Sequence, residues 1–124
     1  MDIIIANTSD DPIYRQIVKQ FKNMIIRGDV AEGELLPSIR TLARELQISV
    51  ITTKRAYEEL ERESYIVTVP GKGTFIAAQD KELFREMRLK IVEEKLSEAV
   101  DAAKSIELGY DDMRSMLKIL YEEV

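Results

Sequence analysis

Two short predicted helices with almost no chain between them are the feature of this sequence that most restricts its fold. Each is preceded by a serine, Ser38 or Ser49. Serine is a favoured N-cap because its hydroxyl oxygen accepts a hydrogen bond from a backbone N–H of the first turn. The turn between the helices is Gln47-Ile48-Ser49. Two short helices joined by so tight a turn form a helix-turn-helix.

Apolar residues recur at helical spacing in both segments and predict which faces are buried. The first helix is expected to bury Ile39, Leu42, Ala43 and Leu46. The second is expected to extend from its cap to about Glu63 and to bury Thr53, Ala56, Tyr57 and Leu60.

After Tyr65 the pattern changes from helical to extended. Residues 66–69 and 74–76 are β-branched or aromatic, and Pro70-Gly71-Lys72-Gly73 separates them. Two such runs about a glycine-rich connection predict a two-stranded hairpin. A helix-turn-helix followed at once by a hairpin is a winged helix. The sequence therefore predicts a mainly α fold with one small β-hairpin.

Further helices are predicted on both sides of this unit. One should begin near Pro12 and end at Gly28, a long one should cover residues 81–106, and a short one should follow the break at Gly109. We therefore divide the chain into a winged helix-turn-helix domain, residues 1–78, and a helical tail, residues 79–124. Two helices of this size cannot bury a sizeable core between themselves. The tail needs the first domain, a second copy of itself, or both.

Missing residue types exclude much chemistry. The chain has no cysteine and no histidine, so it lacks disulfides, thiolate nucleophiles, the commonest general base and the commonest transition-metal ligand. The acidic pairs Asp111-Asp112 and Glu122-Glu123 offer too few converging oxygens for Ca²⁺ or Mg²⁺, and we interpret them as solvated charge. The sequence predicts no enzyme activity, no metal and no cofactor.

The sequence also gives no indication of a membrane protein. No apolar run approaches the roughly 18 to 20 residues that span a bilayer. The first ten residues lack the basic and apolar regions of a signal peptide. We expect a cytoplasmic location.

The distribution of charge matters more than the net charge of −5, which by itself argues against a nucleic-acid partner. Residues 1–78 contain 10 Lys and Arg against 11 Asp and Glu, whereas residues 79–124 contain 8 against 12. Between Ser38 and Tyr57 the only acidic residue is Glu45. The basic residues of that stretch are Arg40, Arg44, Lys54 and Arg55. One locally basic stretch in an acidic protein is compatible with a restricted DNA-binding face.

Three separated motifs resemble the GntR family of bacterial transcription regulators. Residues 36–43, Leu-Pro-Ser-Ile-Arg-Thr-Leu-Ala, resemble the second helix of that family. Residues 52–60, Thr-Thr-Lys-Arg-Ala-Tyr-Glu-Glu-Leu, resemble its third helix, and residues 70–76, Pro-Gly-Lys-Gly-Thr-Phe-Ile, resemble its wing. The resemblance covers roughly residues 11–78 and implies a transcription regulator that binds double-stranded DNA.

The short tail resembles that of the YtrA-like branch of the family. Most members carry a large C-terminal effector-binding domain, but here only about 45 residues follow the wing. The resemblance implies a repressor whose tail serves dimerisation, and in this branch the regulated genes are often those of ABC transporters. The sequence does not identify a small-molecule effector. Two positions depart from the family pattern, because Val50 stands where many members have an arginine that contacts bases, and Ser64 stands where a glycine is usual.

The start of the second helix of the helix-turn-helix is expected to enter the major groove. The hydroxyls of Ser49 and Thr52 suit phosphate oxygens. Val50 and Ile51 are expected to pack on thymine methyl groups, although ordinary surface or core positions remain the alternative. The predicted DNA-binding set from the two helices is Ser38, Arg40, Ser49, Val50, Ile51, Thr52, Thr53 and Lys54.

Arg40 is the residue expected to recognise a base, since the arginine fork matches O6 and N7 of guanine. The alternative is an ion pair with Glu45. Lys54 is expected to contact a phosphate or a base, or else to be a solvated charge. At the wing tip, Gly71 and Gly73 allow a close backbone approach and Lys72 supplies charge for a minor-groove or phosphate contact. The alternative there is a simple hairpin turn.

An apolar stripe in the tail predicts a homodimer interface. A two-fold dimer would present two recognition helices to a palindromic operator. The predicted interface residues are Leu83, Met87, Ile91, Leu96, Met113, Leu117 and Leu120. A competing hypothesis is a winged helix that binds another protein instead of DNA. The retained basic residues, Lys72 among them, favour DNA.

Overall fold

The computed structural model describes residues 2–123, which form two compact units, 2–84 and 85–123. The elements are α1 (Ile13–Arg27), α2 (Ile39–Leu46), α3 (Val50–Arg62), β1 (Ile66–Val69), β2 (Gly73–Ile76), α4 (Lys81–Ser105) and α5 (Tyr110–Glu123). The fold is mainly helical with one antiparallel hairpin, as the sequence predicts. No helix within 2–123 is long and apolar enough to cross a bilayer.

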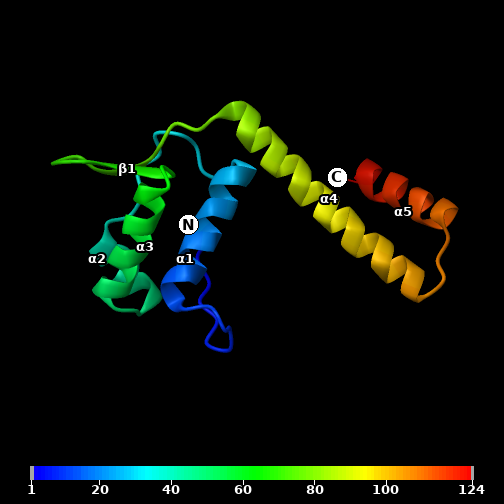
Figure 1. Ribbon diagram of the computed structural model, residues 1–124, viewed down its shortest axis with the longest axis horizontal. Helices are drawn as coiled ribbons and strands as arrows, with labels where there is room; N and C mark the ends of the chain where they lie inside the picture. The colour runs from blue at the N-terminus through cyan, green and yellow to red at the C-terminus, as the bar shows by residue number, and fades with distance from the viewer. Residues whose placement is uncertain (1, 124) are drawn as a thin grey trace. The chain divides into compact units, whose positions relative to one another are not determined.

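The core of the first unit lies where α1 and α2 pack against α3 (Figure 1). Ile17 and Phe21 from α1 are fully buried, as are Leu42 from α2 and Leu60 from α3. The Phe21 and Tyr57 rings meet edge to face with their centroids 6.0 Å apart. The predicted burial of Leu42 and Ala43 on α2 is confirmed, as is that of the whole predicted inward face of α3.

Residues 3–6 lie along α1 and are held by two glutamine side chains. The Gln20 amide donates to the Ile4 carbonyl at 2.7 Å and accepts from the Ile4 N–H at 2.8 Å. Gln16 makes the same pair of bonds with the backbone of Ala6. The glutamine four residues later in α1 therefore bonds to the backbone two residues earlier in the chain, at Ile4 instead of Ala6. Ile3 is buried as a result. No pattern in the sequence predicts this docking.

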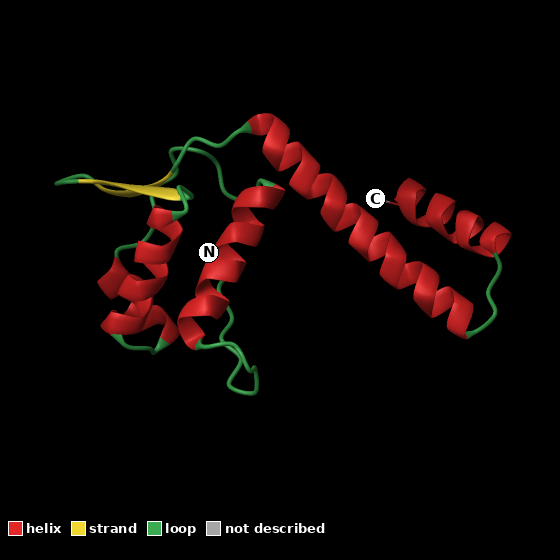
Figure 2. Ribbon diagram, viewed as in Figure 1, coloured by secondary structure: helices red, strands yellow, loops and turns green. Residues whose placement is uncertain are grey.

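The hairpin pairs Ile66 with Ile76 at its base and Val69 with Gly73 at its tip. It extends beyond the ends of the helices of this unit (Figure 2). The loop segment 33–36 lies along β2, with Leu36 N–H donating to Thr74 O at 2.8 Å and Ile76 N–H donating to Glu34 O at 2.9 Å. This added edge anchors the wing to the helices, because Leu36, Ile66 and Ile76 are all buried.

The ends of α2 and α3 are closed by residues in the left-handed conformation other than glycine. Gln47 has φ +57° and Ser64 has φ +65°. After α3, Tyr65 N–H donates to Leu60 O at 2.9 Å and Ser64 N–H donates to Glu61 O at 3.0 Å, which is a Schellman motif. Ser64 therefore occupies a backbone position that favours glycine, as its place in the family pattern predicts.

The first turn of α4 belongs to the first unit. Phe84 is buried, and its ring lies 6.2 Å from that of Tyr65. The compact unit therefore extends to Phe84, beyond the boundary at residue 78 that the sequence suggests.

The second unit contains the rest of α4 and α5 and has almost no core. Of its described residues, only Ala103 is buried. Among the residues predicted for a dimer interface, Leu83, Leu96, Leu117 and Leu120 are 49–59 % exposed, and Met87, Ile91 and Met113 are partly buried. A helix pair that exposes its leucines in this way leaves much apolar surface in water.

Candidate nucleic-acid interface

The starts of α2 and α3 have the same capping arrangement. Ser38 Oγ accepts from Thr41 N–H at 3.1 Å, and Ser49 Oγ accepts from Thr52 N–H at 3.0 Å. Each serine also donates to the hydroxyl oxygen of the same threonine at 2.8 Å. The repeated Ser-x-x-Thr spacing therefore fixes both helix starts through identical local bonds.

The same bonds leave a hydroxyl donor at the start of α3. The Ser49 hydroxyl donates to Thr52 Oγ1. Thr52 Oγ1 accepts that bond and keeps its own proton to donate. The first backbone N–H groups of α3 also lack intrahelical acceptors. Thr52, with these N–H groups, is the donor that faces an approaching anion.

The outward surface of the first turn of α3 is apolar. Val50 is 50 % exposed, and Ile51 is 81 % exposed. The prediction that they project outward is confirmed, and a core position for either one is excluded.

Thr53, by contrast, is fully buried, and its hydroxyl donates to Ser49 O at 3.1 Å. The expectation that its side chain contacts DNA is wrong, because it lies on the helix face that packs against the core.

The basic side chains of the helix-turn-helix differ in their surroundings. Arg40 is exposed and makes no hydrogen bond or ion pair with any described residue, so the pairing with Glu45 does not form. Lys54 makes an exposed ion pair with Glu58 at 3.7 Å. An exposed pair of this kind is weak and costs little to exchange for another anion. Arg40 and Lys54 both remain available to a ligand.

Arg55 is held differently, over an aromatic ring of α1. Its guanidinium carbon lies 3.9 Å from the centroid of the Tyr14 ring, a cation–π contact between α1 and α3. This contact gives Arg55 a structural role that the sequence alone does not reveal.

The wing tip is a three-residue loop, Pro70-Gly71-Lys72. Lys72 N–H donates to Val69 O at 2.9 Å, and Gly71 has φ +77°, so the loop is built on a turn with proline second and glycine third. Gly73 has φ +122°, and a Cβ there would come within 2.9 Å of Leu35 Cδ1. Both glycines are thus accounted for by the turn and by packing within the protein, and Lys72 is left exposed at the tip.

A buried tyrosine ties the recognition helix to the segment before α2. Tyr57 Oη donates to Pro37 O at 2.7 Å, and burial, with a smaller effect from Glu45, raises the pKa of Tyr57 above its ordinary value. The phenol stays protonated and links the middle of α3 to the residue that precedes the cap of α2. The sequence predicts only that Tyr57 is buried, and its bond to Pro37 O is a finding of the structure.

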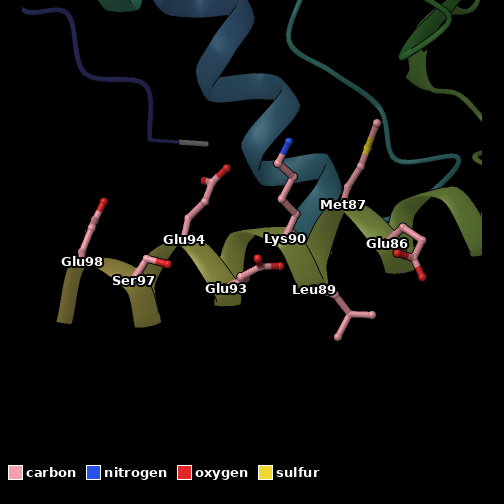
Figure 3. Close-up of a pocket in the computed structure, with 8 residues that line it drawn as sticks. All are labelled: Glu86, Met87, Leu89, Lys90, Glu93, Glu94, Ser97 and Glu98. Atoms are coloured by element: carbon pink, nitrogen blue, oxygen red, sulfur yellow. The ribbon is translucent and has the colours of Figure 1, made fainter. Parts of the chain in front are cut away.

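Acidic side chains elsewhere do not assemble into a second site. Figure 3 shows Glu94 and Glu98 pointing to the same side of α4, whereas Glu93 and Glu86 point in other directions. Within residues 2–123, no three acidic side chains are placed so that they could hold a metal ion.

Comparison with known proteins identifies the fold and its family. Residues 13–76 match the family described as "Bacterial regulatory proteins, gntR family". The chain belongs to the GntR family. It is 32 % identical over 122 residues to the HTH-type transcriptional repressor YtrA of Bacillus subtilis (strain 168), and the match covers 98 % of this chain and 94 % of that protein. The similarity therefore includes the tail as well as the winged helix.

Solved structures agree with this assignment. YtrA from Sulfolobus acidocaldarius, a GntR-family transcription factor, superposes with a TM-score of 0.59 at 34 % identity, covering 77 % of this chain and 97 % of that one. The DNA-binding domain of AraR in complex with operator ORX1 superposes with a TM-score of 0.54, covering 62 % and 96 %, and at 21 % identity it shows the fold alone.

These findings make the chain a GntR-family transcriptional regulator with a winged helix-turn-helix DNA-binding domain. The prediction that it is not an enzyme is confirmed, because its family and relatives are transcription regulators.

Proposed function

We propose that this GntR-family regulator is a homodimeric repressor that binds a palindromic operator. The observation that carries the proposal is the joint exposure of two surfaces: the start of α3 with Arg40 and Lys72, and the leucines of α4 and α5. The first surface suits DNA, and the second suits a copy of itself. The similarity to a named repressor over nearly the full length supports the same conclusion.

In this proposal Arg40 contacts a guanine and Lys54 and Lys72 contact phosphates. Thr52 supplements them with a hydroxyl donor, and the caps at Ser38 and Ser49 hold the helix starts in place. Arginine is preferred for guanine because its planar fork meets O6 and N7 together, whereas lysine acts as a point charge. The basic surface is small, and it accounts for DNA binding by a chain of net charge −5.

The proposed dimer is assembled through the tail. The seven predicted interface residues occupy α4 and α5, and no described residue of the first unit contributes to the set beyond Leu83. Burying exposed leucine surface contributes roughly 25 cal/mol per Å² removed from water. A two-fold dimer also doubles the DNA contacts, and it requires half-sites spaced by about one helical turn.

The first experiment is a DNA titration by fluorescence anisotropy. The purified full chain is titrated with the duplex from just upstream of its own gene and with a scrambled duplex, each at two salt concentrations. We expect a preference of about 10³-fold or more for the native duplex and tight, salt-sensitive binding. Equal, weak binding to both duplexes, together with no sequence enriched from a random pool, would contradict operator recognition.

The dimer is tested in the full chain by light scattering. Leu117→Glu on α5 is expected to lower the molar mass from that of a dimer towards that of a monomer, because a buried charge has no partner in an apolar interface. Ser115→Glu adds the same charge to the same helix, on the opposite side from Leu117, and is expected to leave the dimer intact. A Leu117→Glu protein that stays dimeric would place the interface elsewhere.

We propose further that the protein acts in the cytoplasm and that transporter genes are among its targets, as the YtrA-like branch implies. The competing proposal, a winged helix that binds only protein, is less consistent with an Arg40 that has no partner within residues 2–123. The exposed basic residues of the first unit, Arg40, Lys54 and Lys72 among them, favour a polyanionic partner.

A further inference from the structure

We propose that Val50 and Ile51 recognise the C5 methyl group of a pyrimidine in each operator half-site. The inference rests on the proposed operator binding and specifies what the recognition helix detects there. The most exposed residue in the first turn of that helix, Ile51, carries no polar group.

The exposure of these side chains has no structural explanation within the protein. Ile51 is the most exposed large hydrophobic residue among those described in the first unit, at 81 %, and Val50 is 50 % exposed. The residues of α3 that pack inward are Thr53, Ala56, Tyr57 and Leu60, and Ile51 lies on the opposite side of the helix from them. Two adjacent β-branched residues are also not favoured at a helix start, so neither packing nor propensity accounts for them.

The surroundings indicate DNA as the occupant of this surface. Thr52 offers a free hydroxyl proton beside Ile51, and Lys54 follows on the next turn. Arg40 on α2 is exposed and unpaired within the described chain. Positive charge and hydrogen-bond donors around an apolar patch complement phosphates around an apolar group. They do not complement the apolar interior of a second copy's interface.

Only one group on the major-groove edges of the bases matches such a patch. Valine and isoleucine side chains neither donate nor accept hydrogen bonds, so they cannot distinguish the N and O atoms of the base edges. The C5 methyl of thymine is the one apolar group presented there. Because 5-methylcytosine carries the same methyl at the same position, the surface is expected to accept it in place of thymine.

The test replaces single atoms of the DNA. Duplexes bound by the full-length protein are selected from a random pool, and each thymine of the selected operator is replaced by deoxyuridine, which removes the methyl and leaves base pairing unchanged. We expect the affinity to fall about four-fold when the contacted thymine is replaced in one half-site, and about fifteen-fold when it is replaced in both, as for the loss of one buried methyl in each. Where that T·A pair is replaced by C·G, methylating the cytosine at C5 is expected to recover binding.

Variants then assign the effect to the two side chains. A Val50→Ala, Ile51→Ala double variant is expected to bind thymine and uracil operators equally, with an unchanged salt dependence because no charge is lost. Ile51→Val should retain most of the discrimination. Ile4→Ala is the matched control, since Ile4 is also exposed, at 74 %, but lies in the N-terminal segment on α1. It should discriminate like the unchanged protein.

The outcomes separate this inference from the proposed function. If no sequence is enriched in the selection, operator recognition itself is wrong. If an operator is enriched but no uracil replacement weakens binding, or the double variant discriminates as well as the unchanged protein, only the methyl recognition is wrong. A double variant that changes the molar mass of the protein while its DNA affinity stays the same would assign the surface to a second copy of the chain.

Discussion

Arg40 is the residue on which base recognition is expected to depend most. It is exposed, and no described residue forms an ion pair with it, so its guanidinium requires no intramolecular contact to be broken before it binds. Replacing it with alanine is expected to weaken operator binding by about 1 to 3 kcal/mol and to relax base preference at one position of each half-site. Anisotropy with operators varied one base pair at a time measures both effects.

The control for Arg40→Ala is Arg44→Ala, one turn further along α2, where a charged and exposed side chain is expected to contribute little to base choice. Undiminished discrimination in the Arg40→Ala protein would remove the guanine contact from the proposed interface.

The backbone conformation of Ser64 costs stability. Its φ of +65° lies in the left-handed region, where the Cβ of serine meets a steric cost that glycine does not have. Ser64→Gly is therefore expected to raise the free energy of unfolding by about 1 kcal/mol in urea titrations. Ser64→Ala keeps the Cβ and should give no such gain. A Ser64→Gly protein no more stable than the unchanged one would mean that the serine hydroxyl compensates.

Tyr57 makes the stability of the first unit dependent on pH in the alkaline range. Burial raises the pKa of Tyr57 in the folded state above its ordinary value of 10.0, and the unfolded chain has that ordinary value. As the pH rises above 10, the unfolded state loses the proton first. The free energy of unfolding is therefore unaffected by this group below about pH 10 and falls as the pH rises further. Urea titrations at pH 7 and pH 10.5 are expected to show this fall.

Tyr57→Phe is the variant that isolates this effect. It removes the bond to Pro37 O, so the protein should lose about 1 kcal/mol at pH 7. Its additional loss between pH 7 and pH 10.5 should be smaller than that of the unchanged protein. An equal alkaline loss in both proteins would assign the effect to other groups.

The starts of α2 and α3 and the end of α1 follow from local sequence. The caps at Ser38 and Ser49 and the stop at Gly28 are formed by bonds within a few residues, so the sequence predicts them directly. The docking of the N-terminal segment on α1 is not predicted, because Gln16 and Gln20 bond to backbone 10 and 16 residues away. Such amide side chains carry no periodic pattern that could reveal their partners.

The wing is expected to contact the DNA backbone through Lys72 at its tip. Lys72→Ala should therefore weaken binding to all sequences alike. The slope of log K against log salt should become less steep by about 1 per protomer, as for the loss of one phosphate contact. The measurement is the slope of log K against log salt for operator and scrambled duplexes. Lys95→Ala on α4 is the control, with no change expected. An unaltered slope for Lys72→Ala would remove the wing from the DNA.

The whole chain divides at Phe84, and this division makes a prediction about truncated proteins. A chain that ends at residue 84 retains the packing of Phe84 against Tyr65, whereas one that ends at residue 78 loses it. We expect both to be monomers in light scattering and to bind a palindromic operator poorly. The longer should melt several degrees higher, because burial of a phenylalanine side chain contributes about 1.5 to 3 kcal/mol.

Equal melting temperatures for the two truncated proteins would show that Phe84 contributes little to the first unit. A truncated protein that remains a dimer would contradict the assignment of the interface to the tail. The full-length chain is the reference in both measurements.

Local sequence specifies the order of the elements, the serine caps of α2 and α3, the wing hairpin and the family, because each depends on residues close together in the chain. Helical spacing alone assigned Thr53 to the inward face of α3, where the structure buries it. Tertiary structure decided that the N-terminal segment docks on α1 through Gln16 and Gln20. It also assigned Arg55 to the Tyr14 ring and Phe84 to the winged-helix unit. These outcomes depend on contacts between distant segments, which no local pattern specifies.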